Sequence, residues 1–266
     1  MTDPAPEAEI KVCCASFYES ELVRLFLGDV LHPGGLELTG HLAELIGLGP
    51  GDSVLDVACG RGASAVFLAE TFGCHVTGLD YGQENVAESE ARAAEAGVAH
   101  LTAFRQGDAE RLPLDDGSFD ALISECSFCT FPDKTSAAME MARVLRPGGR
   151  LGLTDVTVSG ALPEDLQSLL AWVACVAGAA TPDEYVATLE QAGFDGFVVE
   201  DRSGDLLELV NGVRKKLLAM ELAVGLGKLD LGDLDLEDGR RLARRAVELI
   251  ESGTVGYTLI AATNGS

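Results

Sequence analysis

The chain has 266 residues, of which 47% are hydrophobic, enough for one large domain or one domain with an elaboration. Its 43 acidic and 19 basic residues give a net charge of −24. A negative field of this size repels phosphate backbones and anionic membranes, so we expect neither a nucleic acid nor a membrane as partner.

The beginning of the chain predicts a cytoplasmic protein. Residues 1–7 are acidic and contain no apolar segment of the kind found in a signal peptide, and no apolar run in the chain is long enough to cross a bilayer. In the cytoplasm the seven cysteines are expected to stay mostly reduced. They are therefore candidates for metal binding or reactivity more than for disulfides.

Helices are predicted ahead of the first strand. Residues 1–9 are expected to be disordered, and the apolar positions in 10–31 predict one or two helices. A turn at 32–35 ends this region, and a helix at 39–45 leads into the first strand. Two interpretations of the turn stay open: it closes on a bound ligand, or it is a plain helix-breaking turn.

The stretch 53–69 predicts a ligand site. An apolar run over 54–57 indicates a buried strand, Gly60 and Gly62 interrupt it, and residues 63–69 resume at helical spacing. This order of strand, glycine turn and helix is typical of the first unit of a doubly wound α/β sheet. Glycine lets the backbone approach a ligand closely, and the start of the helix offers free N–H groups.

Two acids refine the nature of the ligand. Asp56, at the end of the first strand, would repel a phosphate but suits an ammonium or sulfonium group. A second strand at 75–79 ends in Asp80, about 20 residues further on, where an acid can hold ribose hydroxyls. The pattern therefore favours a cationic amino-acid cofactor over a pyrophosphate.

The rest of the chain alternates strands and helices. Further strands are predicted near 100–105 and at 119–124, 150–157, 197–200 and 257–262. Helices are predicted at 83–97, 133–145, 163–178, 182–192, 203–224 and 237–251. We therefore expect an α/β fold with a Rossmann-like, doubly wound, seven-stranded sheet, in which the helices between 203 and 251 form an insertion.

Five motifs in this order resemble the class I S-adenosylmethionine-dependent methyltransferases over about residues 40–158. They are the glycine turn, Asp80, the Gln-Gly-Asp-Ala at 106–109, the strand at 119–123 and the Leu-Arg-Pro-Gly-Gly-Arg at 145–150. The resemblance implies S-adenosyl-L-methionine as cofactor and a cofactor site formed by Asp56, Ala58, Gly60, Gly62, Asp80, Tyr81, Asp108, Ala109 and Ser124. It also implies a helical lid at 1–40, a cofactor-binding core at 41–158 and an acceptor-side region at 159–266.

A narrower resemblance is to the arsenite methyltransferases. Ser-Glu-Cys at 124–126 comes shortly before Phe-Pro-Asp-Lys at 131–134, and Trp172 to Ala179 is followed by a Tyr … Ala-Gly-Phe helix. In that family two cysteines at such positions bind trivalent arsenic. The resemblance implies that Cys126 and Cys175 are the catalytic, arsenic-binding thiolates, and a third thiolate would come from Cys13, Cys14, Cys129 or an external thiol.

The implied chemistry is consistent with these residue types. Trivalent arsenic is soft and thiophilic, and thiolates select such centres. An arsenic lone pair aligned with the sulfonium methyl needs no general base, because it carries no proton, and alignment supplies most of the rate.

The sequence departs from that family, whose typical cysteine-rich tail is also not found here, and leaves rival functions open. A cysteine usual in the helix after the glycine turn is replaced here at about Ala65, which puts the usual disulfide relay in doubt. One rival is a small-molecule O-, N- or C-methyltransferase of the ubiquinone or natural-product type, in which His32, Glu125, Tyr18 or His41 orients or deprotonates the acceptor. Another is a non-catalytic metalloid sensor, which would not need the three acids Asp56, Asp80 and Asp108.

Two other cysteines are expected to have structural roles. Cys59 is expected to pack in the core or to contribute its backbone to the glycine turn, and Cys74 is expected to be a buried packing residue.

Overall fold

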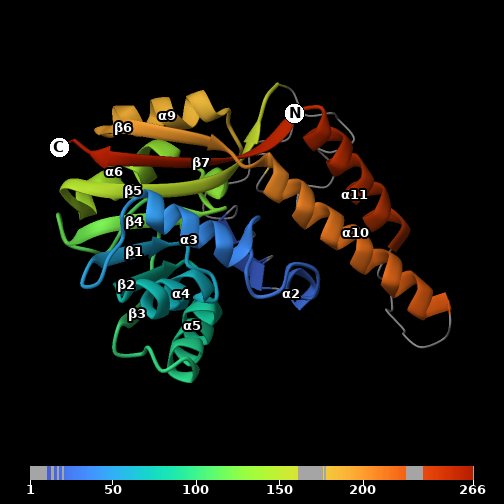
Figure 1. The fold of residues 1–266 in the computed structure, drawn as a ribbon, viewed down its shortest axis with the longest axis horizontal. Coiled ribbons are helices and arrows are strands. Elements are labelled where there is room, and N and C mark those ends of the chain that lie inside the picture. The colour runs from blue at the N-terminus through green and yellow to red at the C-terminus, as the bar shows by residue number, and fades with distance from the viewer. Residues whose placement is uncertain are drawn as a thin grey trace.

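A computed structural model describes residues 11, 12, 15, 16, 18, 19, 21–160, 176, 178–225 and 236–265. The described residues form one seven-stranded sheet with the order β3-β2-β1-β4-β5-β7-β6, covered by helices on both faces (Figure 1). The strands are β1 (Ser53–Val57), β2 (His75–Asp80), β3 (Thr102–Gln106), β4 (Phe119–Glu125), β5 (Leu145–Val158), β6 (Phe194–Asp201) and β7 (Val255–Asn264). This confirms the predicted fold class.

The register of the parallel strands gathers several acids at one edge of the sheet. β1 pairs in parallel with β2 and β4, and Asp56 lies level with Gly78 of β2 and Ile123 of β4. The carboxyl ends of these strands therefore meet at the same edge, so that Asp56, Asp80 and Glu125 lie along it. This edge is where open α/β sheets bind ligands.

The helices are α2 (Glu21–Leu27), α3 (Gly35–Leu45), α4 (Ala63–Phe72), α5 (Gln83–Glu95), α6 (Lys134–Val144), α9 (Pro182–Gln191), α10 (Ser203–Gly225) and α11 (Leu236–Glu251). Consecutive residues of the central strands contribute to opposite cores, because side chains alternate across a sheet. Ile123 packs with the α3 and α4 side, whereas Leu122 packs with the α6 and α9 side.

The helix predicted at 182–192 is α9, and it begins with a cap at Thr181. The Thr181 hydroxyl accepts a hydrogen bond from the Glu184 N–H, the Glu184 carboxylate accepts one from the Thr181 N–H, and Pro182 occupies the first turn of α9. This capping box satisfies backbone donors that the first turn of the helix leaves unpaired.

Two helices form an arm inserted between the last two strands. α10 and α11 leave β6, pack against each other and return to β7, which lies antiparallel between β5 and β6 (Figure 1). The predicted insertion is therefore present.

α3 begins at Gly35, four residues before the predicted 39, because Leu38 packs in the core together with Leu42. The helix therefore crosses residue 40, the predicted boundary between the helical lid and the cofactor-binding core. Of the helix predicted at 163–178, residues 163–175 and 177 lie outside the described residues. Among the helices that the structure describes, none is long and apolar enough to cross a membrane.

Candidate functional site: a pocket at the carboxyl edge of the sheet

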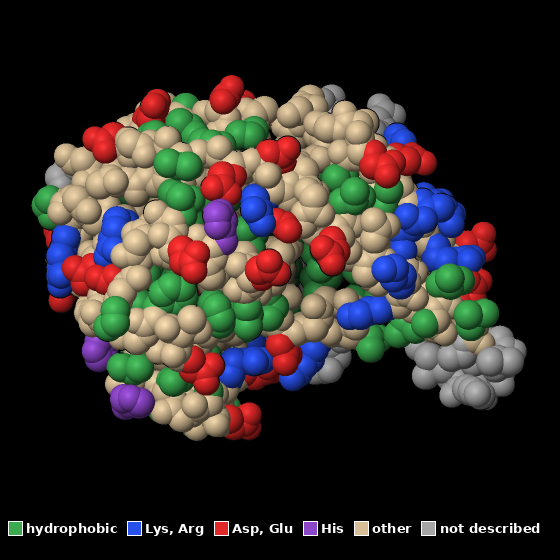
Figure 2. Space-filling view, viewed as in Figure 1, with side chains coloured by type: hydrophobic (Ala, Val, Ile, Leu, Met, Phe, Trp, Pro, Cys, Tyr) green, Lys and Arg blue, Asp and Glu red, His purple; other side chains and the backbone are tan. Residues whose placement is uncertain are grey.

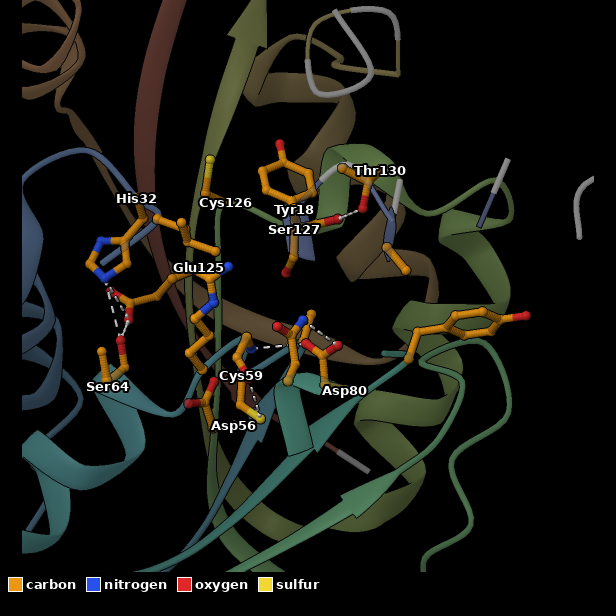
Figure 3. Close-up of a pocket in the computed structure, with 18 of the residues that line it drawn as sticks. Tyr18, His32, Asp56, Cys59, Ser64, Asp80, Glu125, Cys126, Ser127 and Thr130 are labelled. Carbon is orange, nitrogen blue, oxygen red and sulfur yellow. Dashed lines mark hydrogen bonds and ion pairs between the residues drawn. The ribbon is translucent and has the colours of Figure 1, made fainter. Parts of the chain in front are cut away.

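A pocket opens at the carboxyl ends of β1, β2 and β4 (Figure 3). The N-terminal segment forms part of its wall through Lys11, Ala15 and Tyr18. The sheet edge and the turn after β1 contribute the predicted residues Asp56, Ala58, Gly60, Asp80, Tyr81, Asp108 and Cys126. The pocket thus brings together most of the predicted cofactor site and one of the two predicted catalytic cysteines.

The glycine turn after β1 is tightly folded. Gly62, the N-cap of α4, has φ of 74°, and a Cβ added there would lie 2.8 Å from the Ser89 side chain. Gly60 has φ of 53°, and even Ala58 adopts φ of 60°, a conformation that is strained for a residue with a side chain. This path of the backbone brings the Gly60 N–H to Asp80 at the end of β2, and its positive φ values favour glycine at both positions.

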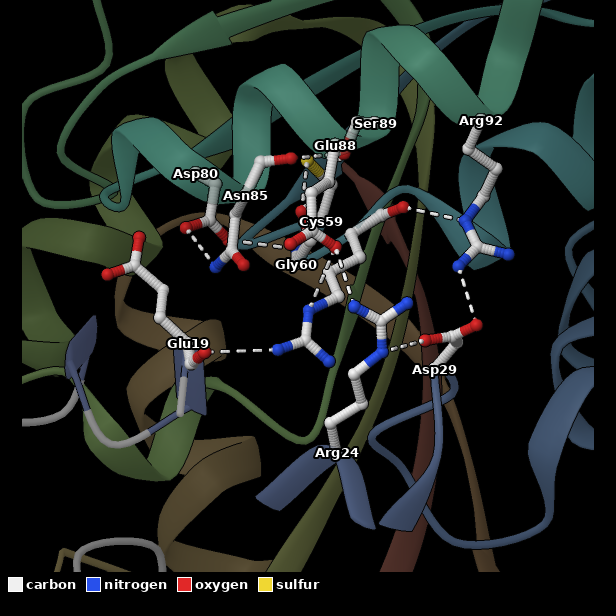
Figure 4. A network of polar contacts seen from close by, with 11 residues as sticks. Glu19, Arg24, Asp29, Cys59, Gly60, Asp80, Asn85, Glu88, Ser89 and Arg92 are labelled. Atoms are coloured by element: carbon white, nitrogen blue, oxygen red, sulfur yellow. Dashed lines mark hydrogen bonds and ion pairs between the residues drawn. The ribbon is translucent and has the colours of Figure 1, made fainter. Parts of the chain in front are cut away.

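Asp80 is held in a fixed orientation before any ligand binds. One carboxylate oxygen accepts a hydrogen bond from the Gly60 N–H at 2.8 Å, and the other accepts from the Gly82 N–H at 2.8 Å and the Asn85 amide at 3.0 Å (Figure 4). Burial raises the pKa of Asp80, and these hydrogen bonds act in the opposite direction. The side chain is therefore a preorganised acceptor for hydroxyl groups.

Asp56 is the least satisfied acid in the pocket. The residue is buried, with an exposed fraction of 3%. Its Oδ2 atom has no hydrogen-bond partner among the described residues. Burial raises its pKa well above the usual range, and the negative charges of Glu125 and Asp80 add to the effect. A cationic group in the pocket would remove this penalty, which fits an amino-acid cofactor carrying an ammonium and a sulfonium.

Asp108 already has a cationic partner that the sequence did not predict. Lys11 Nζ lies 2.7 Å from Asp108 Oδ2 and also contacts Glu110, while the other Asp108 oxygen accepts a hydrogen bond from the Glu110 N–H. The two carboxylates raise the pKa of Lys11 despite its partial burial, which acts the other way. Nothing in the local sequence around residue 11 signals this contact, because its partners are about 100 residues away.

A buried carboxylate cluster forms the wall opposite Asp80. Glu125 accepts hydrogen bonds from Ser64 Oγ at 2.6 Å and from Thr39 Oγ1 at 3.1 Å, and His32 Nε2 lies 3.5 Å away (Figure 3). The four side chains come from the turn before α3, from α3, from the start of α4 and from the end of β4. The turn at 32–35 therefore closes on the pocket through His32.

Cys126 lies next to Glu125 and lines the pocket. Its φ is 53°, and its N–H donates to the Thr154 carbonyl at 2.7 Å, which anchors this strained residue to β5. Figure 3 shows its sulfur pointing away from the Glu125 carboxylate. Cys129, by contrast, is buried and does not line the pocket. Cys13, Cys14 and Cys175 lie outside the described residues.

Other predicted residues occupy supporting positions. Ala109 is buried, and Ser124 is fully buried with its hydroxyl 2.6 Å from that of Ser127. His41 lies away from the pocket, 2.8 Å from Glu200, and so does not serve as an acceptor-orienting residue there.

Cys59 lines the pocket beside Gly60, and burial raises its pKa well above the usual range. Cys74 is fully buried outside the pocket, and burial raises its pKa to about 11, as expected for a packing residue.

Arg61, inside the glycine turn, was also not predicted as a site residue. It is only 2% exposed, its guanidinium donates to the Glu19 carbonyl at 3.2 Å and its Nε lies 3.2 Å from Glu88. In the sequence, the only indication that Arg61 has a special role is its place between Gly60 and Gly62. It ties the N-terminal segment to the turn and to α5.

Comparisons with known proteins agree with this geometry. A family model described as a methyltransferase domain matches residues 48–193. The 27-O-demethylrifamycin SV methyltransferase of Amycolatopsis mediterranei is 36% identical over 76% of this chain and 79% of its own length. The arsenite methyltransferase of Halobacterium salinarum is 34% identical over 59% of this chain and 40% of its own length.

Among solved structures, a Haemonchus contortus phosphoethanolamine N-methyltransferase 2 in complex with S-adenosylhomocysteine matches with a TM-score of 0.78 at 20% identity. The match covers 95% of this chain and 57% of that one, and it shows the fold. The chain therefore belongs to the methyltransferase domain family and is a class I, S-adenosylmethionine-dependent methyltransferase.

Proposed function

We propose that this enzyme transfers a methyl group to trivalent arsenic or a related thiophilic species held by cysteine thiolates. The observation that carries the proposal is the position of Cys126, a soft ligand in the wall of the cofactor pocket, one residue after the sheet edge. S-adenosylmethionine supplies an electrophilic methyl on a sulfonium, and Asp56, Gly60 and Asp80 are the residues that would hold it. An arsenite methyltransferase is among the relatives at 34% identity, which is compatible with this acceptor, and a natural-product methyltransferase at 36% identity is among them as well.

We propose a second thiolate from the segment before Gly178. A Cβ added at Gly178 would lie 2.1 Å from the Cys129 carbonyl oxygen, so the chain at 178 is packed directly on the loop that follows Cys126. Cys175 lies three residues before Gly178 in the sequence. We propose that Cys126 and Cys175 bind the acceptor together, with Cys13, Cys14 or an external thiol as the source of a third ligand, because Cys129 is buried and does not line the pocket.

The pocket chemistry suits a neutral, soft acceptor. The attacking group is a lone pair: the new bond joins arsenic to the methyl carbon as the carbon–sulfonium bond breaks, and no proton has to leave. Asp56 and Glu125 are both buried in the pocket wall, so an anionic acceptor would meet two carboxylates and would be disfavoured. Arsenite is uncharged at neutral pH and avoids this repulsion.

A second candidate function rests on the Glu125 cluster. Glu125, His32, Ser64 and Thr39 meet in the pocket wall, which is an arrangement that could orient or deprotonate a hydroxyl or amine of a small molecule. In this case Glu125→Gln would lower the rate with a phenol or amine acceptor by roughly 10²-fold or more and would change its pH profile. Under the arsenic proposal the same variant keeps its rate to within a few-fold.

The test is a product screen with the purified protein. The enzyme is incubated with S-adenosylmethionine and either arsenite plus a thiol reductant or a panel of phenols and amines, and products are identified by mass spectrometry. We expect methylated arsenic together with S-adenosylhomocysteine. Arsenite should also quench the emission of Trp172, the single tryptophan of the chain. Turnover of the organic panel with no arsenic product would select the second candidate instead.

A further inference from the structure

The positive charge of this acidic chain is concentrated on the α10–α11 arm. Residues 203–251 hold 8 of the 19 Lys and Arg residues but only 10 of the 43 acids. The other 217 residues hold 11 basic and 33 acidic residues. Figure 2 shows Lys and Arg side chains gathered over the arm, with carboxylates scattered across the body. The molecule therefore has a strongly acidic body and an arm that is nearly neutral overall, with Lys and Arg side chains gathered on the face that Figure 2 shows.

The cations of the arm line a groove between its two helices. The groove has a volume of about 530 Å³ and is lined by Asn211, Arg214, Lys215, Leu218, Arg240 and Arg244. Arg240 is paired with Glu221 at 2.6 Å. Among the described residues no carboxylate pairs with Arg214, Lys215 or Arg244, and the Arg214 guanidinium donates a hydrogen bond to the Asn211 side chain at 3.1 Å. Three cations thus face the groove without a counter-charge.

Apolar side chains continue the groove towards the end of α10. Leu218 and Leu222 are 51% and 61% exposed, which is high for leucine, and they follow Asn211 and Lys215 on one face at helical spacing. From Asn211 to Leu222 this face extends about 17 Å. A cationic groove between two helices with leucines at one end is a surface that fits an acidic, partly apolar helix. An extended polyanion fits poorly, because the acidic body would repel it.

Such a helix is present on the chain itself. α5 buries Asn85, Val86, Ser89 and Ala93. It exposes Glu84, Ala87, Glu88, Ala91 and Glu95 on the opposite side. Its 13 residues extend about 20 Å, close to the length of the groove face. Among the described residues neither Glu84 nor Glu95 is in a salt bridge.

We propose that the α10–α11 groove of one molecule receives α5 of a second copy. Figure 1 places α5 at the lower left of the body and the arm at the right, so α5 of the same molecule does not reach the groove. In the proposed contact Arg214, Lys215 and Arg244 face Glu84 and Glu95. Two molecules lying antiparallel make this contact twice, which closes a dimer with two-fold symmetry.

The test uses charge reversal and sedimentation analysis of the full chain. Wild-type protein is followed over a concentration series at about 0.15 M and about 1 M salt, where the Debye lengths are roughly 8 and 3 Å. We expect a dimer at the lower salt that weakens at the higher one. Arg214→Glu with Arg244→Glu, and separately Glu84→Lys with Glu95→Lys, should each weaken dimerisation at least tenfold.

The decisive measurement is rescue. Combining all four reversals in one chain restores opposite charges across both contacts and should restore the dimer. Glu70→Lys with Glu190→Lys is the matched control: both residues are exposed on other elements, the change in charge equals that of the α5 variant, and the dimer should be unaffected. Circular dichroism confirms that each variant is folded. A wild type that stays monomeric at both salts, or a dimer that neither reversal weakens, overturns the proposal, as does a quadruple variant that fails to reassociate.

Discussion

The two sides of the pocket are built in different ways. The proposed cofactor side comes from one continuous stretch, β1 to the turn after β3, and its acid Asp80 is oriented mainly by backbone N–H groups. The proposed acceptor side joins segments that are far apart in the chain, and its contacts, such as Ser64 and Thr39 on Glu125, run from side chain to side chain.

This difference explains what each side can specify. Backbone donors exist whatever the side chains are, so the cofactor side needs little more than glycines and two acids at the right spacing. The acceptor side depends on the identity of each side chain and is therefore free to change with the substrate. We expect mutations on the two sides to separate cofactor binding from acceptor turnover, and four predictions test that separation.

The largest effect is expected at Cys126. Cys126→Ser removes a soft ligand, and misplacing the acceptor should lower arsenite methylation by roughly 10²-fold. Binding of S-adenosylmethionine, measured by calorimetry, should stay unchanged. Cys74→Ser, a buried cysteine outside the pocket, is the control and should retain activity. Arsenite methylation that survives in Cys126→Ser would remove the basis for assigning this residue to the acceptor.

The next effect is expected on the cofactor side. Asp80→Ala loses an acceptor that three donors hold in place, and charge-assisted hydrogen bonds contribute about 1.5–3 kcal/mol. Calorimetry should show roughly 10- to 100-fold weaker binding of S-adenosylmethionine, while Glu90→Ala, on the exposed side of α5, should bind normally. Undiminished affinity in Asp80→Ala would mean that the ribose is held elsewhere.

Replacing Asp56 is expected to raise the stability of the fold and to weaken cofactor binding. Because its pKa is raised in the folded protein, its carboxylate destabilises the fold once the pH exceeds the unfolded value of about 3.9. Asp56→Asn should therefore be more stable than wild type by about 1 kcal/mol near neutral pH, and this gain should shrink as the pH falls towards 4. Its affinity for S-adenosylmethionine should fall about tenfold. Denaturant unfolding at several pH values provides the measurement, and a gain that does not depend on pH would contradict the assignment.

The smallest effect is expected at Lys11. Its ion pair occupies Asp108, one of the acids that the resemblance places in the cofactor site, so Lys11→Ala should free that carboxylate and tighten cofactor binding a few-fold, since ion pairs near the surface contribute up to about 1 kcal/mol. Lys216→Ala, which removes a contact to the Phe26 carbonyl outside the pocket, is the comparison. Weaker binding in Lys11→Ala would show instead that Lys11 contacts the cofactor directly.

The strands and helices were largely predictable because their signals are local. The apolar run before Asp56, the glycines at 60 and 62 and the Thr181–Pro182 cap each define an element from neighbouring residues. The errors lie at the ends: α3 begins four residues early because the core needs Leu38, and β6 extends beyond 197–200 because its pairing with β7 continues to Phe194 and Asp201. Long-range packing and pairing decide such boundaries.

The sequence by itself determined the sheet, the glycine turn and the acids of the cofactor side, since all of these follow from hydrophobic period and from spacing within about 60 residues. Only the tertiary structure decided that Lys11 occupies Asp108, that His32 and Thr39 meet Glu125, that His41 faces Glu200 instead, and that Cys129 is buried while Cys126 is not. The reason is physical: each of these depends on which side chains meet when distant segments pack, and no periodic pattern along the chain records that meeting.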